Sequence, residues 1–352
     1  MNTISITNMR LVSQQLITAD FKTPREIIAW LGAIQAQDFS MAKWGIGARL
    51  PGITDKEVED AMNKGEFVRT HILRPTWHFV SRDDIHWMLQ LSAPRLKGIY
   101  KTYDKYLDIT PDFITKTNSL ISKILDKEPH QTRQDIGAKL QEEGIECDNR
   151  RMTHIMSWAE LEGIVCNGTV KGTKQTYDLL ENRVPKPNII FDKNESLYKL
   201  AYKYFRSHGP ATLQDFVWWS GLTTTEAKKA IEFIKSDFIF ETIGLQTYIF
   251  HELCARYIPN RDTIHFLPAF DETFVSYKDR TEILPLEHQK KVIVSNGVFH
   301  PTISKNGEII GTWKKVSTKK EISINTKYIF EPDKSLHKLI DKASSDLYAF
   351  YK

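Results

Sequence analysis

Two amides and a carboxylate stand close together in the segment Gln35–Ala36–Gln37–Asp38, at the end of a short amphipathic helix. On a regular α-helix, residues i and i+2 point about 200° apart, so Gln35 and Gln37 face one pocket only where the backbone is extended or tightly turned. In that arrangement, two neutral amides can hold one water molecule. The alternative is that both side chains cap the helix end and satisfy its backbone carbonyl groups.

The start of that helix is well marked. Thr23 is a candidate N-cap, Pro24 suits the first helical position, and Glu26 completes a capping box. An apolar stripe follows at helical spacing, made of Ile27, Leu31 and Ile34. Gln35 falls one turn after Leu31, at the boundary between packing and cavity.

The same start signal, a threonine followed three residues later by an acid, recurs along the chain. It occurs at Thr23/Glu26, Thr54/Glu57, Thr132/Asp135, Thr212/Asp215 and Thr223/Glu226. After each group of helices the pattern becomes β-rich, at residues 67–80, 164–180 and 238–250. Helix, helix and hairpin in that order is typical of a winged helix, so the sequence predicts three such modules.

The C-terminal part predicts a different module. Short strand candidates there are 263–267, 291–295, 302–303, 309–313 and 322–325, and a helix is expected over 334–351. The predicted fold class is α+β: three tandem winged-helix modules, then a small β-barrel-like C-terminal module and a terminal helix. The expected boundaries are 1–115 with the two-amide motif, 116–188, 189–255 and 256–352, with a proline-containing linker over 182–188.

Composition limits the class of protein. The chain has 352 residues, of which 41% are hydrophobic and 26% charged, so it is ordinarily globular, and its net charge of +4 permits contact with a polyanion. Three cysteines without a Cys-x-x-Cys pair suit a reducing cytoplasm. No apolar run is long enough to cross a bilayer. We expect a cytoplasmic monomer with no metal and no cofactor.

Several stretches together resemble the winged-helix DNA-binding family of AlkZ/YcaQ-like DNA glycosylases, over nearly the whole chain. They are residues 33–38 (AIQAQD), 73–78 (LRPTWH), 211–222 (ATLQDFVWWSGL) and 267–272 (LPAFDE). The resemblance implies tandem winged helices around a DNA-binding channel and a role in repair. In the AlkZ-like branch, a Gln-apolar-Gln motif is associated with hydrolysis of the bond between deoxyribose and an alkylated base. Gln35–Ala36–Gln37 matches that motif.

YcaQ-like relatives have an acid at the second position of the motif, whereas the acid of this chain comes one step later, at Asp38. Asp38 is therefore not equated with that catalytic acid. It either assists electrostatically or caps backbone amides. Trp77 and His78 either support the pocket by stacking or by a phosphate contact, or belong to the core. Trp218 and Trp219 are expected to be packing residues.

Basic residues are candidates for contact with the DNA backbone. The candidates are Arg69, Arg74, Arg95, Lys97, Lys101, Lys171, Lys174, Lys314 and Lys315. Residues 278–320 hold nine Lys or Arg against four Asp or Glu, including Lys319 and Lys320, which predicts a positive C-terminal module. As an alternative, the basic residues on the helix are simply solvated, beside half-buried tyrosines. The alternative for Arg69 and Arg74 is an ion pair with Asp38 or Glu66.

The function expected from these features is a monofunctional DNA glycosylase, a hydrolase of the N-glycosidic bond. Its expected partner is double-stranded DNA carrying alkylated purines, including bulky or crosslinked adducts. Two other classes fit the same layout. A noncatalytic winged-helix DNA-binding or transcriptional regulatory protein would use the same basic surface, and a protein-interaction scaffold would need no DNA affinity. Base release separates the first class from the others, and salt-dependent DNA binding separates the second from the third.

Overall fold

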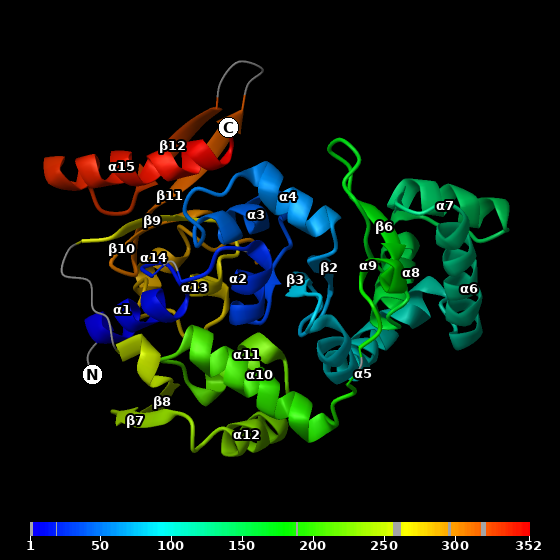
Figure 1. The fold of residues 1–352 in the computed structure, drawn as a ribbon, viewed down its shortest axis with the longest axis horizontal. Helices are drawn as coiled ribbons and strands as arrows, with labels where there is room; N and C mark the ends of the chain where they lie inside the picture. The colour runs from blue at the N-terminus through cyan, green and yellow to red at the C-terminus, as the bar shows by residue number, and fades with distance from the viewer. Residues whose placement is uncertain (1–2, 19, 188, 256–261, 295–296, 318–321) are drawn as a thin grey trace. The chain divides into compact units, whose positions relative to one another are not determined.

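The computed structural model describes residues 3–18, 20–187, 189–255, 262–294, 297–317 and 322–352. The chain forms two compact units: Met1–Val58 together with Leu197–Lys352 make the first, and Glu59–Ser196 make the second. Figure 1 draws their helices and small sheets along the chain, which confirms the α+β class. None of the helices in the described ranges is long and apolar enough to cross a membrane.

The first unit combines helices from both ends of the chain with the C-terminal sheet. Its elements are α1 (Thr3–Ser13), α2 (Pro24–Leu31), β1 (Ile34–Gln35), α3 (Phe39–Gly47), α10 (Lys193–His208, which begins in the second unit), α11 (Leu213–Ser220), α12 (Thr224–Phe233), β7 (Ile239–Ile243), β8 (Gln246–Phe250), the 3-10 helix Glu252–Ala255, β9 (Ile264–Leu267), α13 (Glu272–Val275), α14 (Leu286–Gln289), β10 (Thr302–Lys305), β11 (Glu308–Ser317), β12 (Ile322–Tyr328) and α15 (Lys334–Phe350). Helix α4 (Asp55–Asn63) begins here and ends in the second unit.

The second unit holds the hairpin of β2 (Phe67–His71) and β3 (Trp77–Ser81) and the middle helices. Its other elements are α5 (Ile85–Asp104), the 3-10 helix Lys105–Leu107, α6 (Pro111–Lys127), β4 (Gln131–Thr132), α7 (Arg133–Glu142), α8 (Asn149–Leu161), β5 (Val165–Asn167), β6 (Thr176–Leu179) and α9 (Leu180–Arg183). Strands β2 and β3 pair antiparallel. Strands β4, β6 and β5 form a three-stranded sheet in that order.

The predicted helix starts are confirmed. Four of the five Thr–acid pairs form reciprocal capping boxes at the starts of α2, α7, α11 and α12. At the start of α4, the Thr54 N–H donates to Glu57 Oε2 over 2.8 Å and the Glu57 N–H donates to Thr54 Oγ1 over 3.3 Å. Each box satisfies two otherwise unpaired donors within one turn, which is why the signal is readable from local sequence.

The three β-rich segments predicted after the helices are also confirmed as hairpins: β2–β3, β5–β6 and β7–β8. The division into three winged-helix modules remains a prediction. The end of helix α9 overlaps the first two residues of the predicted linker. The two prolines of the linker are compatible with this helix because both come after its last residue. Asn188 of that linker lies outside the described residues.

The C-terminal strands form an open antiparallel sheet in the order β12–β11–β10–β9, with α15 beside it (Figure 1). Among the described residues they do not close into a barrel, so the barrel-like expectation is corrected: four strands are too few to close around a core. The strand expected at 291–295 is also absent from the described part of that segment, where Ile293 makes only an isolated bridge to Phe299; Ser295 lies outside it.

Candidate active site

The two-amide motif lies just beyond a helix and not at its last turn. Helix α2 ends at Leu31, and Gly32 follows with φ 80° and ψ −53°, a conformation that glycine adopts far more readily than other residues. The chain then runs into strand β1, which ends with Gln35. The expected position at the helix end was therefore wrong by one turn, and the extended backbone that the two amides require is present at Gln35.

The two glutamines differ in exposure. Gln35 is buried, with 7% of its surface accessible, whereas Gln37 is exposed. The backbone N–H of Gln35 donates to Glu272 Oε1 over 2.7 Å. The Gln35 side chain therefore starts from a buried backbone that is held by a hydrogen bond, whereas Gln37, two residues later, is exposed to solvent.

Asp38 caps the next helix. Its carboxylate accepts the backbone N–H of Met41 over 3.0 Å, and its own backbone is extended, as an N-cap residue requires. Of the two alternatives for Asp38, the structure shows the capping of backbone amides. The motif is thus bounded by Gly32 on one side and by the capped start of α3 on the other.

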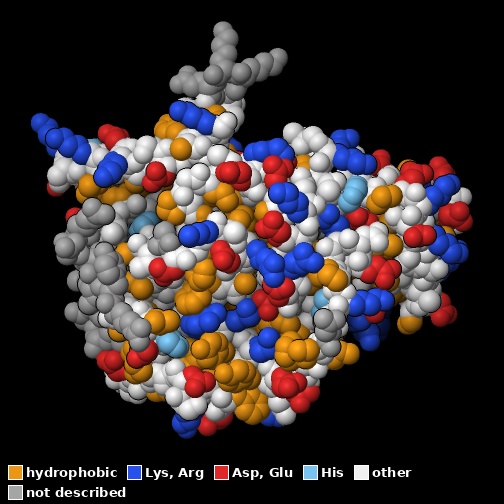
Figure 2. Space-filling view, in the orientation of Figure 1, with side chains coloured by type: hydrophobic (Ala, Val, Ile, Leu, Met, Phe, Trp, Pro, Cys, Tyr) orange, Lys and Arg blue, Asp and Glu red, His pale blue; other side chains and the backbone are white. Residues whose placement is uncertain are grey.

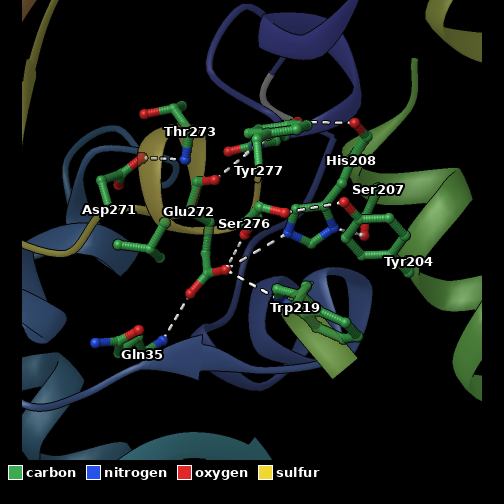
Figure 3. A network of polar contacts seen from close by, with 12 residues as sticks. Gln35, Tyr204, Ser207, His208, Trp219, Asp271, Glu272, Thr273, Ser276 and Tyr277 are labelled. Atoms are coloured by element: carbon green, nitrogen blue, oxygen red, sulfur yellow. Dashed lines mark hydrogen bonds and ion pairs between the residues drawn. The ribbon is translucent and has the colours of Figure 1, made fainter. Parts of the chain in front are cut away.

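Glu272, the first residue of α13, is the centre of a buried polar network (Figure 3). Its Oε1 accepts the Gln35 N–H, and its Oε2 accepts the Trp219 indole N–H over 3.2 Å and the Ser276 hydroxyl. Only 1% of Glu272 is exposed. A carboxylate at this depth is tolerable because strong donors surround it.

His208 borders the same carboxylate. Its Nε2 lies 3.7 Å from Glu272 Oε2, and its Nδ1 lies 2.8 Å from the Ser207 hydroxyl, which itself donates to the Lys203 carbonyl oxygen. Because that hydroxyl proton is already used, Nδ1–H is the donor to Ser207. Burial lowers the pKa of His208, against a smaller opposite effect of Glu272.

A second buried pair holds the turn that precedes Glu272. Asp271 makes two hydrogen bonds with Arg49, at 2.8 Å and 3.1 Å, and Asp271 also caps α13. Phe270, just before it, has φ 60°, which is uncommon for an aromatic residue and is held by its surroundings. The adjacent acids Asp271 and Glu272 therefore bind different partners in the first unit.

The proposed supporting residues Trp77 and His78 lie on β3 of the second unit. The Trp77 indole N–H donates to Glu160 Oε1 over 3.4 Å, and its ring packs on His71 with centroids 4.7 Å apart. His78 is fully buried, and its Nδ1–H donates to the Thr76 carbonyl oxygen over 2.9 Å. Their contacts are those of a hairpin packed on α8, and a site role for either residue stays a prediction.

The basic residues of the second unit occupy several kinds of position. The Arg69 guanidinium stacks over Trp77 at 4.5 Å, Arg95 donates to the Leu73 carbonyl oxygen, and Lys97 pairs with Glu162 over 2.8 Å. Arg74 is half-buried in the β2–β3 loop. Solvent-exposed positions are held by Lys101 on α5 and by Lys171 and Lys174 in the β5–β6 connection.

Lys314 and Lys315 are neighbours on β11, so their side chains leave opposite faces of the sheet. Lys314 is exposed, whereas Lys315 is half-buried with its ammonium 3.5 Å from the centre of the Tyr351 ring. Burial lowers the pKa of Lys315, and nearby Lys43 adds to this while Asp55 and Asp38 oppose it. Lys319 and Lys320 lie outside the described residues.

Figure 2 shows Lys and Arg side chains interspersed with Asp and Glu over the face that it draws. Among its described residues, this face therefore carries no surface of one sign of charge that would mark a DNA-binding region by itself.

The buried network includes residues that the sequence did not single out as site residues. Glu272 and Trp219 both fall within stretches quoted for the family resemblance, so a signal existed, although Trp219 was expected only to pack. His208 and Ser276 had no signal in the sequence. All four come close to Gln35 only through folding, since Glu272 is 237 positions away along the chain.

The fold and the two-amide segment define a class of protein. The family described as "DNA glycosylase AlkZ-like" matches residues 28–338. The chain therefore belongs to the AlkZ-like DNA glycosylases, a family of DNA-binding repair enzymes, as the resemblance predicted.

Individual relatives agree with this assignment. An interstrand DNA cross-link repair glycosylase of Streptomyces sahachiroi is 21% identical over 313 residues, 83% of this chain and 82% of the relative. The solved structure of Streptomyces sahachiroi DNA glycosylase AlkZ superposes with a TM-score of 0.81 at 17% identity, covering 99% of this chain and 96% of that one. This similarity shows that the two proteins share a fold.

Proposed function

We propose that this protein hydrolyses the N-glycosidic bond of alkylated purines in double-stranded DNA, including bulky or crosslinked adducts. The observation that carries the proposal is the position of Gln35–Ala36–Gln37 on non-helical backbone: the Gln35 backbone N–H is bound by Glu272, and Gln37 is exposed. Family membership supports the reaction class, and the similarity to the interstrand DNA cross-link repair glycosylase of Streptomyces sahachiroi supports crosslinked adducts.

The chemistry suits neutral amides. A purine alkylated at N7 or N3 already carries positive charge, so it departs without strong general-acid assistance. The enzyme has to place a water beside C1′ and stabilise a transition state with oxocarbenium character. Glutamine carbonyl oxygens can accept a hydrogen bond from that water and favour the developing positive charge, and the NH2 groups fix their orientation.

Single-turnover release of 7-methylguanine from a duplex tests the proposal. Gln37→Ala should lower the rate constant about tenfold or more, and the Gln35→Ala/Gln37→Ala double variant should lower it further, with DNA affinity nearly unchanged. Gln214→Ala, an exposed glutamine on α11, is the matched control and should keep the wild-type rate. A wild-type protein that releases no alkylated base favours the noncatalytic regulator. A double variant as fast as wild type would show instead that the two amides do not carry the reaction.

We also propose that the enzyme is monofunctional, because direct attack by water needs no covalent intermediate and the motif has no adjacent lysine amine. Borohydride added during turnover should trap no protein–DNA adduct. A trapped adduct that persists in the Gln35→Ala/Gln37→Ala variant would instead place a nucleophilic amine elsewhere in the protein.

A further inference from the structure

We propose that Glu272 is a positioning residue for hydrolysis, which fixes the direction of the Gln35 side chain by binding the Gln35 backbone N–H. The inference rests on the function proposed above and extends it to a residue in a distant part of the chain. The observation behind it is the 2.7 Å hydrogen bond from the Gln35 N–H to Glu272 Oε1 (Figure 3). Both residues are buried.

The two oxygens of Glu272 connect separate elements of the first unit. Oε1 binds β1, whereas Oε2 binds α11 through Trp219 and its own helix α13 through Ser276. Because backbone and indole N–H groups can only donate, both oxygens must be acceptors for both bonds to form. Methionine in place of Glu272 fills a similar volume with no oxygen, and glutamine keeps only one.

The carboxylate is itself held firmly. The Asp271–Arg49 pair fixes the preceding residue, and the Gln14 amide donates to the Glu272 carbonyl oxygen over 3.4 Å. Trp219 and His208, which flank the carboxylate, have no exposed side-chain surface. Glu272 therefore has little freedom to move, and its bond to the Gln35 N–H fixes the peptide plane from which the Gln35 side chain leaves β1.

A buried carboxylate is an expensive way to hold a strand, since an apolar side chain of the same size usually fills such a position at lower cost. A charge-assisted hydrogen bond is shorter and more directional than a neutral one. Catalytic groups need positions held to within about half an ångström. This requirement accounts for an acid beneath Gln35, whereas packing alone does not.

The experiment compares full-length wild-type protein with Glu272→Gln and Glu272→Met. We expect the single-turnover rate constant at saturating enzyme to fall about tenfold or more in Glu272→Met and by a smaller factor in Glu272→Gln, which retains one acceptor. The half-saturating enzyme concentration should stay within about twofold of wild type, because Glu272 is too deeply buried to touch DNA. Faster hydrogen exchange at the Gln35 amide should accompany the loss of rate.

Glu282→Gln is the matched control for general damage to the first unit. Glu282 pairs with Arg10 of α1 over 2.7 Å and accepts the Tyr248 hydroxyl of β8. Because these partners lie on elements other than β1, its variant should keep the wild-type rate constant even if its stability falls. If Glu272→Met does not fold, Glu272→Gln carries the same comparison.

Wild-type rate constants in the Glu272 variants, or equal losses in Glu272→Gln and Glu282→Gln, overturn the inference and leave the proposed function intact. A change confined to DNA affinity overturns it as well. A wild-type protein that releases no base overturns the proposed function first and this inference with it.

Discussion

Asp38 illustrates how a single residue can be assigned to structure or to chemistry. Its carboxylate accepts the Met41 N–H at the start of α3, and that bond explains an acid at this position without a role in hydrolysis. Gln35 and Gln37, by contrast, precede the capped helix on backbone that is not helical. At the scale of single residues, the amides remain the candidates for water binding, and Asp38 holds the helix that follows them.

We expect Asp38→Asn, which keeps a capping oxygen and removes the charge, to release 7-methylguanine within about twofold of the wild-type rate. Asp38→Ala should lower the free energy of unfolding by about 1 kcal/mol, because one N–H loses its partner. Asp333→Ala removes the corresponding cap of α15 and serves as control. A tenfold loss of rate in Asp38→Asn would show that its charge acts on the reaction.

Helices and strands determine which way the motif and the basic side chains point. Gly32 ends α2 early enough for β1 to form, and the alternation of β11 separates Lys314 from Lys315. The family resemblance could not indicate either effect, because both depend on backbone conformation at one position. Two predictions belong to this scale.

Gly32→Ala should lower the free energy of unfolding by about 1 to 2 kcal/mol, because a side chain is strained at φ 80°. Gly98→Ala is the opposite case: Gly98 lies inside α5, and a Cβ there would meet nothing within 4 Å. That variant should be more stable by up to about 1 kcal/mol. Urea unfolding of both variants measures the difference, and the same sign for both would contradict the helix-end assignment.

Lys314→Ala should weaken binding to duplexes of any sequence and reduce the salt slope of the binding constant by about one, if Lys314 meets a phosphate. Lys315→Ala should leave the slope unchanged, since the Lys315 ammonium lies against Tyr351, and should instead cost up to about 1 kcal/mol of stability. Fluorescence anisotropy at several salt concentrations gives the slopes. Equal slopes for wild type and Lys314→Ala would remove this strand from the DNA-binding surface.

At the scale of the whole molecule, the first unit is assembled from both ends of the chain. Arg10 of α1 donates to the Pro210 carbonyl oxygen over 2.9 Å and pairs with Glu282, residues separated by 200 and 272 positions. The site depends on the same long-range assembly, because Gln35 and Glu272 come from opposite sides of the second unit in sequence. Conditions that loosen this unit should therefore affect stability and the site together.

Acid should destabilise the first unit through His265 on β9. Burial lowers the pKa of His265 to about 4, helped by Arg49 and opposed by Asp271. The unfolded chain takes up the proton near pH 6.5, so this contribution is full above that pH and is lost as the pH falls toward 4. We expect a loss of about 2 kcal/mol, because each pKa unit corresponds to about 1.4 kcal/mol and the residue as a whole is only half-buried.

Urea unfolding between pH 7 and pH 4.5 measures this loss. His265→Gln should flatten the decline, whereas His300→Gln, at an exposed position, should leave it unchanged. A decline of the same steepness in His265→Gln would assign the acid sensitivity to other groups, of which His208 is the next, since burial lowers its pKa as well.

The sequence by itself determined the features that depend on neighbours a few residues apart. The five Thr–acid pairs predicted five helix starts correctly, because a capping box closes within one turn. Alternating apolar residues and turn signals located the three hairpins and the C-terminal strands except one. Four stretches together, of which Gln35–Ala36–Gln37 is part of one, pointed to the family.

Only the tertiary structure decided that Glu272 binds Gln35, that the C-terminal sheet stays open, and that Lys315 lies against Tyr351. These contacts join residues that are 36 to more than 200 positions apart. No periodicity or cap reports such pairs, because they form only when distant elements bury their apolar faces together and leave polar groups that must find partners in the interior.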